Sequence, residues 1–532
     1  MPETDAYETW WWSILLLLWA AAPAQRVVDV LQAIPGPSVG HGAAAEDAAA
    51  VEEEIESGGR PGEPLDQASQ RRLLRLLRRD PLLAATGGLR RAARSRLLKR
   101  LLGGVEAARQ VAAEELVEAL AEDMAAPAAV REGGPGADNE GEGWQYKTFA
   151  YGPMQPPLPG PAVAAGSGAG AGAGAGEGAG DGQRPPMPLP VPLPPPLPEA
   201  VVQRHVRQVA AALEQQHVSA AAQEQLGRVI GECANWAAAL NTHAGPSGSS
   251  SSGSSSGSSS GSGSGSDPCG LISLRVSGNM LAGSTGCHEW EASFALAQLV
   301  LRRPELFAGR RVLELGAGAG LVGVVLARAG AQLVAATDGS AQAVSNCAAN
   351  LRLNLPPQQH PVVECGQAAE LAALEQGVAV CRLAWEEPLP PGGLSCDTVV
   401  ASDVLYDPEV VPVLVSLLVR LLQPAAGTPE TVGGSESGAG GAASKDAMPA
   451  RTDAASVAYI ATLRRNPATL QLFLETAASA GLCVAEVDGW GDPFAPAAGG
   501  TAVRFHLGVL DEKSVAERIV VHRVVYADIL TD

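Results

Sequence analysis

Apolar residues in the second half of the chain fall into short runs typical of buried strands, separated by helical patterns and loops. Five runs are the clearest, at 311–315, 332–337, 378–383, 398–402 and 456–462. Helical patterns follow most of them, at 321–330, 341–353, 408–422 and 468–480. Further runs, separated by loops, lie at 482–487, 502–509 and 518–526. Alternation of this kind predicts an α/β fold, in which a parallel, doubly wound sheet is closed by an antiparallel edge.

A strongly apolar run at 10–22 opens the chain and favours a buried N-terminal helix. The residues before it include Glu3, Asp5 and Glu8 and no basic residue, which is the opposite of a secretory leader. The run is also shorter than a membrane span requires. A targeting segment remains the alternative.

Leucine pairs interleave with positive charge between residues 71 and 100. This stretch holds eleven Lys or Arg residues and one acid, Asp80. The pattern predicts an amphipathic helical pair with a solvated basic face. The alternative is a docking surface for an acidic or RNA-containing partner. With the helix expected across 105–125, these segments predict a small α-helical N-terminal domain, residues 1–131.

Low-complexity sequence separates this domain from the strand-rich part. Residues 132–267 hold Gly-Ala, polyproline and Ser/Gly repeats, which favour a flexible linker, with one helical segment at 199–242. An alternating run at 271–276 then predicts an edge strand. Residues 268–532 are expected to form the second domain, interrupted by a Gly/Ala/Ser insertion at 425–452.

Charge and cysteine content narrow the class of protein. The net charge of −20 argues against a general nucleic-acid binder. Eight cysteines are scattered without a Cys-x-x-Cys pair or a His spacing suited to zinc, so no metal site is expected. Free thiols favour a reducing compartment, and we expect a cytoplasmic protein.

A glycine-rich turn follows the first strand of the second domain. Gly316, Gly318 and Gly320 come directly after 311–315, and Glu314 lies near the strand's end. Asp338 ends the next strand, where the ribose of a nucleotide-like ligand is held in such folds. Gly318-x-Gly320-x-x-Gly323 formally matches a dinucleotide fingerprint, but it begins too late after the strand. Glu-x-Gly-x-Gly-x-Gly favours S-adenosylmethionine (SAM), with a nicotinamide site or a purely structural turn as alternatives.

Further polar and aromatic residues follow the other parallel strands. Trp385, Asp403 and the segment Arg464-Arg465-Asn466 come after three different strands. Because ligands of doubly wound sheets gather at the carboxyl ends of the strands, these residues are expected to converge with Glu314 and Asp338.

The region 284–532 resembles the seven-β-strand SAM-dependent protein-lysine methyltransferases. Within them it is most similar to the family that methylates a lysine of eukaryotic translation elongation factor 2. The glycine motif and Asp-x-x-Tyr mark the broad group, and Arg-Asn-Pro followed by Gln-Leu-Phe marks the subfamily. The stretches that carry the resemblance are Thr285-Gly-x-x-x-Trp290, Arg311–Leu321, Leu383-Ala-Trp385, Ala401–Glu409 and Arg465–Phe473.

The resemblance implies a seven-stranded Rossmann-like sheet, a SAM cofactor and a protein substrate, elongation factor 2. It implies Asp403 and Tyr406 as catalytic residues, and Arg465 and Asn466 as substrate-binding residues. We expect a monomer that binds neither membrane nor nucleic acid directly. The SAM-binding residues implied are Trp290, Glu314, Gly316, Gly318, Asp338, Trp385 and Ser402.

Simpler roles and rival functions stay open at this point. Asp403 could cap the helix expected near residue 408, Trp385 could be core packing, and Arg465 with Asn466 could close a turn. A SAM enzyme acting on a small molecule would share the fold. A non-catalytic binding protein would be expected to lack Glu314, Asp338 or Asp403, and all three are present.

Overall fold

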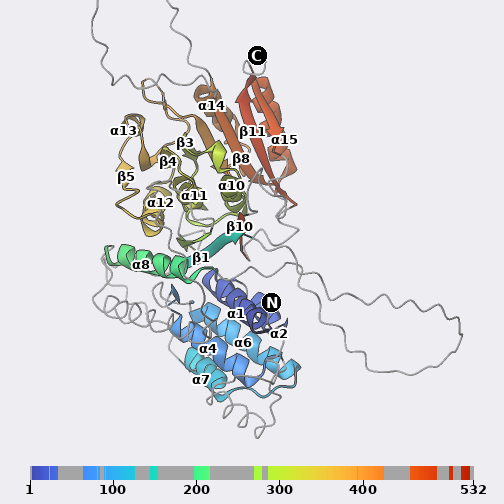
Figure 1. The fold of residues 1–532 in the computed structure, drawn as a ribbon. Coiled ribbons are helices and arrows are strands. Elements are labelled where there is room, and N and C mark those ends of the chain that lie inside the picture. The colour runs from blue at the N-terminus through green and yellow to red at the C-terminus, as the bar shows by residue number, and fades with distance from the viewer. Residues whose placement is uncertain are drawn as a thin grey trace, which may run out of the picture.

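Two packed parts and a small sheet between them make up the described chain (Figure 1). The computed structural model describes residues 3–22, 24–33, 64–80, 82–83, 89, 91–125, 144–153, 197–215, 269–277, 285–391, 393–423, 456–487, 503–506 and 517–527. The expected insertion at 425–452, most of the expected linker, and residues 216–242 of the expected helical segment lie outside these ranges.

An eight-stranded sheet forms the centre of the second part, in the order β5-β6-β4-β3-β7-β8-β11-β9. The strands from β5 to β8 are parallel to their neighbours, while β11 is antiparallel to both β8 and β9. The predicted parallel sheet with an antiparallel edge is therefore confirmed. The strands are β3 (Arg311–Leu315), β4 (Leu333–Asp338), β5 (Val362–Cys365), β6 (Gly377–Arg382), β7 (Thr398–Ser402), β8 (Val457–Leu463), β9 (Leu482–Glu486) and β11 (Ile519–Tyr526).

The expected count of seven strands is corrected to eight. The additional strand is β5, which lies at one end of the sheet and pairs only with β6. The sequence pattern that would predict β5 is weak, because the strand is four residues long and its side chains alternate little in polarity. Val362 is half-buried and Val363 is exposed.

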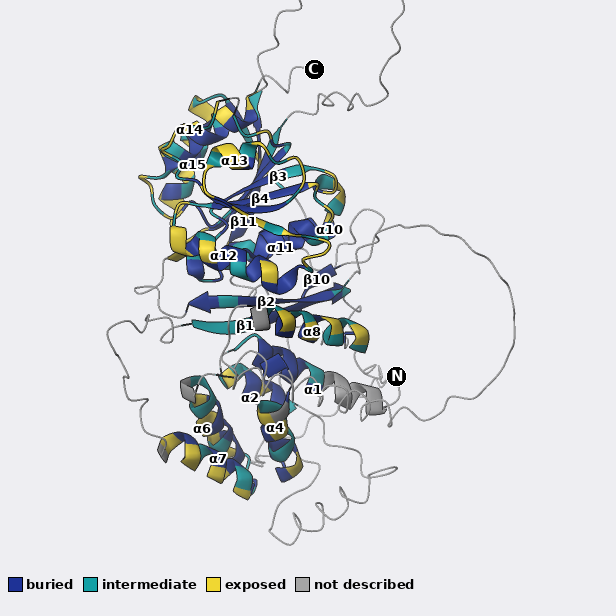
Figure 2. Ribbon diagram, turned by 90° about the vertical axis from the view of Figure 1, so that its left-hand side faces the viewer, coloured by how far each residue is buried: buried dark blue, intermediate teal, exposed yellow. Residues whose placement is uncertain are grey.

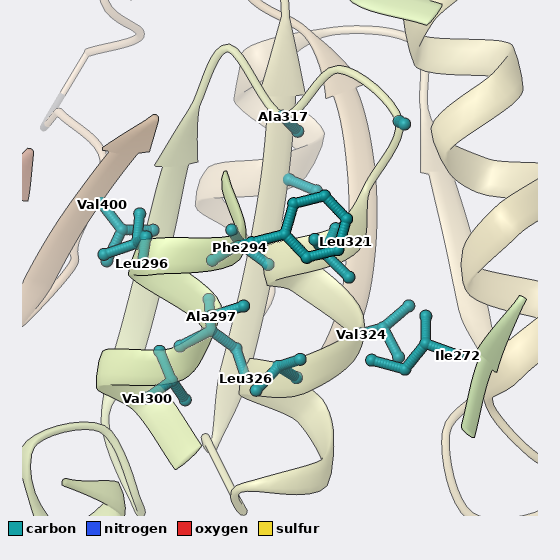
Figure 3. Close-up of a cluster of buried hydrophobic side chains, with 14 of the residues drawn as sticks. Ile272, Phe294, Leu296, Ala297, Val300, Ala317, Leu321, Val324, Leu326 and Val400 are labelled. Atoms are coloured by element: carbon teal, nitrogen blue, oxygen red, sulfur yellow. The ribbon is translucent and has the colours of Figure 1, made fainter. Parts of the chain in front are cut away.

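Helices cover both faces of this sheet, because successive strand residues point to opposite sides. Val312 and Val334 pack with α10 (Glu291–Arg302), α11 (Leu321–Arg328) and α12 (Ala341–Asn354). Leu313 and Ala335 pack on the other side with α13 (Ala368–Ala372), α14 (Val411–Leu422) and α15 (Pro467–Ser479). In Figure 3, Phe294 of α10 lies against Leu321 at the start of α11, so this core continues into the glycine turn.

A separate three-stranded antiparallel sheet lies beside α11 and α12 (Figure 2). Its order is β10-β1-β2, with β1 (Trp144–Pro153) in the middle, β2 (Gly270–Ser277) on one side and β10 (Val503–Phe505) on the other. The edge strand predicted at 271–276 is confirmed. The strand expected at 502–509 is shorter and belongs to this sheet. Finding β1 within the range expected to be linker is a correction, since only a helix was expected there.

Five helices of the first part share one apolar core with β1 and α8 (Glu199–Gln215). The basic helices α4 and α6 pair with acids of α7: Arg71 with Glu115 at 3.1 Å, and Arg94 with Asp123. The buried N-terminal helix is confirmed as α1. The helices are α1 (Glu3–Trp19), α2 (Ala24–Ala33), α4 (Gln67–Arg79), α6 (Arg91–Ala107) and α7 (Glu114–Ala125).

Helix α8 joins the small sheet to the second part. Nε2 of His205 on α8 lies 2.8 Å from Oγ of Ser273 on β2, and that hydroxyl lies 2.7 Å from Oγ1 of Thr148 on β1. The side-chain amide of Asn354, the last residue of α12, bonds the backbone N–H and C=O of Ser273. Within the described residues, no helix combines the length and apolar character needed to cross a bilayer. The domain boundaries at 131 and 267 stay a prediction.

Candidate active site

The carboxyl ends of five parallel strands bring the expected site residues to one edge of the sheet. Leu315 of β3 pairs in register with Thr337 of β4 and with Ala401 of β7. Asp338 and Asp403, which follow these partners closely, therefore lie at the same end of the sheet. The convergence expected from the sequence is present in the fold.

The glycine turn after β3 needs residues without a Cβ atom. Gly316 and Gly318 have φ angles of 67° and 54°, a region that side chains disfavour. A Cβ on Gly318 would lie 2.9 Å from the carbonyl oxygen of Gly286, and one on Gly316 would lie 2.9 Å from Val404. The glycines thus let two neighbouring segments, 285–287 and the extension of β7, pack directly on the turn.

Asp338 fixes the turn by accepting hydrogen bonds from backbone N–H groups. Its Oδ2 accepts a hydrogen bond from the N–H of Gly318 at 3.1 Å, and its Oδ1 accepts one from the N–H of Ser340 at 2.9 Å. Burial raises the pKa of Asp338, while these backbone donors oppose the rise. The carboxylate is half-buried at the end of β4, so part of it faces the open side of the turn.

Glu314 lies beneath the turn instead of beside it. Its side chain is 1% exposed, and Oε2 has no hydrogen-bond partner. Burial raises the pKa of Glu314 to about 8, with a smaller contribution from the charge of Asp338. The group is therefore protonated at neutral pH unless a positive charge approaches.

Trp385 and Ser402 lie at the carboxyl ends of β6 and β7, on either side of the glycine turn in the strand order. The Trp385 ring is half-buried, and its Cζ2 lies 3.8 Å from where a Cβ on Gly316 would stand. The ring also packs against the core between the sheet and α14, so the core-packing alternative for Trp385 is present as well. Ser402 is the last residue of β7 and is partly exposed.

Asp403 adopts an unusual backbone conformation directly after β7. Its φ is 55°, in the left-handed region, and its side chain is 4% exposed. Oδ1 accepts from the N–H of Leu463 at 3.2 Å, and Oδ2 accepts from Nη2 of Arg465 at 3.1 Å. Burial raises the pKa of Asp403, and the Arg465 charge opposes that rise.

The helix-cap alternative for Asp403 is wrong. Helix α14 begins at Val411, its cap position is Val410, and no side chain caps it. The carboxylate of Asp403 is directed to β8 and the residues after it. Tyr406, three residues on, is 65% exposed, so its hydroxyl and ring are accessible from solvent.

Arg465 and Asn466 have different environments. The Arg465 guanidinium lies over the Trp290 ring, 4.8 Å from its centroid, and its Nη2 donates to Oε2 of Glu291 at 2.9 Å. Asn466 is the N-cap of α15, and its side chain accepts from the N–H of Ala468 at 3.0 Å. The turn-closing alternative is therefore present for Asn466, while Arg465 forms part of the carboxylate cluster.

Glu291 and Glu289 were missed in the sequence. Glu291 starts α10, so an acid there has a sufficient explanation as a favourable helix-start charge. Glu289 forms an ion pair with Lys147 of β1, which no local pattern could reveal. Both residues adjoin Trp290 in the sequence, and that position could have marked them as site residues. The Nε1 of Trp290 donates to the carbonyl of Thr285 at 3.0 Å.

Comparison with known proteins gives matches to lysine methyltransferases. Residues 272–428 match a family model described as lysine methyltransferase. "Protein-lysine N-methyltransferase EEF2KMT" of Bos taurus is 32% identical over 216 residues, which cover 38% of this chain and 55% of that protein. "Protein-lysine N-methyltransferase EFM3" of Chaetomium thermophilum is 33% identical over 142 residues, covering 26% and 40%.

The chain was also compared with solved structures. The TehB-like SAM-dependent methyltransferase from Corynebacterium glutamicum is 14% identical, with a TM-score of 0.25. The superposition covers 44% of this chain and 88% of that one.

The family match identifies S-adenosyl-L-methionine as the cofactor, and the site's residues fit it. The turn at Gly316 and Gly318 is fixed by positive φ angles and by the hydrogen bond from the Gly318 N–H to Asp338. Asp338 is the acidic side chain beside the turn, where it can accept from ligand hydroxyls, while Glu314 lies buried beneath it. The aromatic ring of Trp385 lies beside Gly316, where a flat base could stack.

The matched regions span about half the length of the curated relatives or less. The family-model match at 272–428 includes the glycine turn, Asp338 and Asp403. The resemblance drawn from the sequence is confirmed: residues 272–428 match the lysine methyltransferase family model, and the chain is similar to the EEF2KMT and EFM3 protein-lysine methyltransferases.

Proposed function

We propose that this protein is a SAM-dependent protein-lysine N-methyltransferase. The observation that carries the proposal is the placement of Asp403. A buried, oriented carboxylate stands at the same sheet edge as the glycine turn and Asp338, with the exposed Tyr406 three residues away. A site for a cationic donor and a carboxylate for an incoming amine are thus adjacent.

Asp403 receives the target lysine in this proposal. A lysine in water is protonated at neutral pH, and its amine must lose that proton before it can act as a nucleophile. The low exposure of Asp403 favours pairing with the ammonium, and desolvation of the lysine lowers its pKa so that the proton leaves to water. Tyr406 orients the amine through its hydroxyl or its ring face.

The cofactor-binding residues position the donor opposite this amine. When bound, SAM supplies a methyl group on a positively charged sulfur. Asp338 holds the ribose hydroxyls, and Trp385 stacks on the adenine. Ser402 lies between these cofactor-binding residues and Asp403, which receives the lysine. The other residues around the cofactor are Trp290, Glu314, Gly316 and Gly318. Correct relative placement of amine and donor contributes most of the rate enhancement.

The protein substrate we propose is translation elongation factor 2. The support is the similarity to EEF2KMT and EFM3, together with the Arg465-Asn-Pro segment that carries the subfamily resemblance. We further propose that the protein acts as a cytoplasmic monomer. The basic helices within residues 1–131 would then form a docking surface for an acidic part of the substrate.

Incubation of the purified protein with labelled SAM and a cell lysate tests the proposal. A single labelled band of elongation-factor size is the expected result. Label confined to small molecules would favour a small-molecule methyltransferase instead. Binding of SAM without any transfer would favour a non-catalytic binding protein.

A further inference from the structure

A positively charged nitrogen already occupies the space where Asp403 would receive an amine. Nη2 of Arg465 lies 2.9 Å from Oε2 of Glu291 and 3.1 Å from Oδ2 of Asp403. The guanidinium also lies over the Trp290 ring, 4.8 Å from its centroid. Two carboxylates and an aromatic face, from residues 290–291 and from Asp403, therefore surround one cation.

The contact pattern is that of an ammonium group. Guanidinium groups usually pair with a carboxylate through two parallel N–H bonds. Here one nitrogen, Nη2, bridges two different carboxylates, as a compact ammonium with three donors does. An indole face suits the methylene and ammonium end of a lysine equally well.

We propose that Arg465 stands in for the substrate lysine, and that the lysine enters by displacing it. Glu291, Asp403 and Trp290 are then the cation site of the acceptor, and Arg465 is a positioning residue that keeps this site closed until a substrate arrives. The inference rests on the proposed function, which it deepens by adding Glu291 and by giving Arg465 a role opposite to substrate binding.

The exposed fractions of the three charged side chains allow a lysine to displace Arg465. The Arg465 side chain is 37% exposed and that of Glu291 is 31% exposed, so the arginine can turn into solvent. Asp403 is 4% exposed and keeps its bond to the N–H of Leu463, which holds its carboxylate in place when Arg465 leaves. The site therefore persists without the arginine.

Binding of n-butylammonium tests the inference without relying on catalysis. Its affinity is measured by saturation-transfer NMR, with n-butanol as the neutral comparison. Arg465→Gln should bind n-butylammonium about fivefold more tightly than the parent protein, because a partly exposed ion pair no longer competes. Arg464→Gln, which removes the neighbouring exposed charge, should leave the affinity unchanged. Adding Glu291→Gln to Arg465→Gln should cancel the gain.

Unchanged or weaker n-butylammonium binding in Arg465→Gln would overturn the inference. Arg465→Met retains the aliphatic stem over Trp290 and replaces the Gln variant if that variant does not fold. With the protein substrate, Arg465→Gln should lower KM, whereas a higher KM would show that Arg465 binds the substrate.

The two proposals can fail separately. If the parent protein methylates no protein but the n-butylammonium affinities change as expected, the proposed function fails and the cation site stands. If it methylates a protein and n-butylammonium binds equally to all variants, the proposed function stands and this inference fails.

Discussion

Oδ2 of Asp403 accepts a hydrogen bond from Nη2 of Arg465 at 3.1 Å, although the two residues follow different strands. Because β7 and β8 are parallel neighbours, both strands deliver these side chains to one edge of the sheet. The arginine offsets part of the effect of burial on the Asp403 pKa. The pairing therefore opposes the loss of charge that burial favours for this carboxylate.

Asp403→Asn should reduce methyl transfer by roughly a hundredfold or more, the usual cost of removing one oriented charge-stabilising group. The amide oxygen can still accept from the Leu463 N–H, so the fold and SAM binding should persist. Transfer of labelled methyl and calorimetric titration with SAM check the two parts. Glu409→Gln, an exposed neighbour, is the matched variant and should retain activity. Full activity in Asp403→Asn would remove the role assigned to this carboxylate.

Asp338→Asn should weaken SAM binding about tenfold, the typical value of a hydrogen bond to a charged group. Its oxygens hold the N–H groups of Gly318 and Ser340, so the substitution loosens the turn as well. Equilibrium titration with S-adenosylhomocysteine measures the loss. An unchanged affinity would mean that the ligand does not contact this end of β4.

Gly318→Ala should destabilise the protein by more than about 1 kcal/mol, the strain of placing a side chain at positive φ. The added Cβ would also lie 2.9 Å from the carbonyl oxygen of Gly286. Gly330→Ala is the matched variant, because Gly330 has a φ of 83° but open space around it. Urea unfolding of both should show a larger loss for Gly318→Ala, and equal losses would contradict the packing role of the turn.

Titration of Glu314 should make stability depend on pH. Its pKa is raised from 4.5 to about 8 in the folded protein. Between these values the folded state holds a proton that the unfolded chain has released, so the free energy of unfolding falls as pH rises. Glu314→Gln should show a flatter profile over this window. Parallel profiles for the two proteins would mean that Glu314 is ionised beneath the turn.

Lys147→Met should lower stability by about 3 kcal/mol, because it leaves the buried carboxylate of Glu289 without its lysine. SAM binding should weaken too, since Glu289 belongs to the segment that carries Trp290. Chemical unfolding and SAM titration measure both effects. The double variant Lys147→Met/Glu289→Leu should be more stable than Lys147→Met alone, and a further loss would exclude the ion pair as the cause.

The sheet around the turn was predictable because each of its strands carries its own signal. Residues 311–315 and 333–337 are mostly apolar runs, followed directly by Gly316 and Asp338. Doubly wound topology then fixes where Asp338 and Asp403 must lie. The same reasoning missed β5, whose four residues include the exposed Val363.

Pairing across long distances in the sequence was not predictable. The strand at Val503–Phe505 alternates well enough to be recognised, but alternation does not identify its partner β1. Likewise, Arg465 was expected at the site, whereas its contacts with Glu291 and Trp290 depend on how α10 meets β8. Local patterns predict elements, and only packing decides which side chains meet.

Strand β1 has a consequence for how the chain can be divided. Residues 144–153 supply the middle strand between β2 and β10, so a fragment that starts at residue 268 would leave two strands with open backbone edges. Such a fragment would be prone to aggregate even though it contains every residue assigned to the chemistry. A fragment designed to keep the candidate site folded should therefore also contain residues 144–153, although these lie far from it in the sequence.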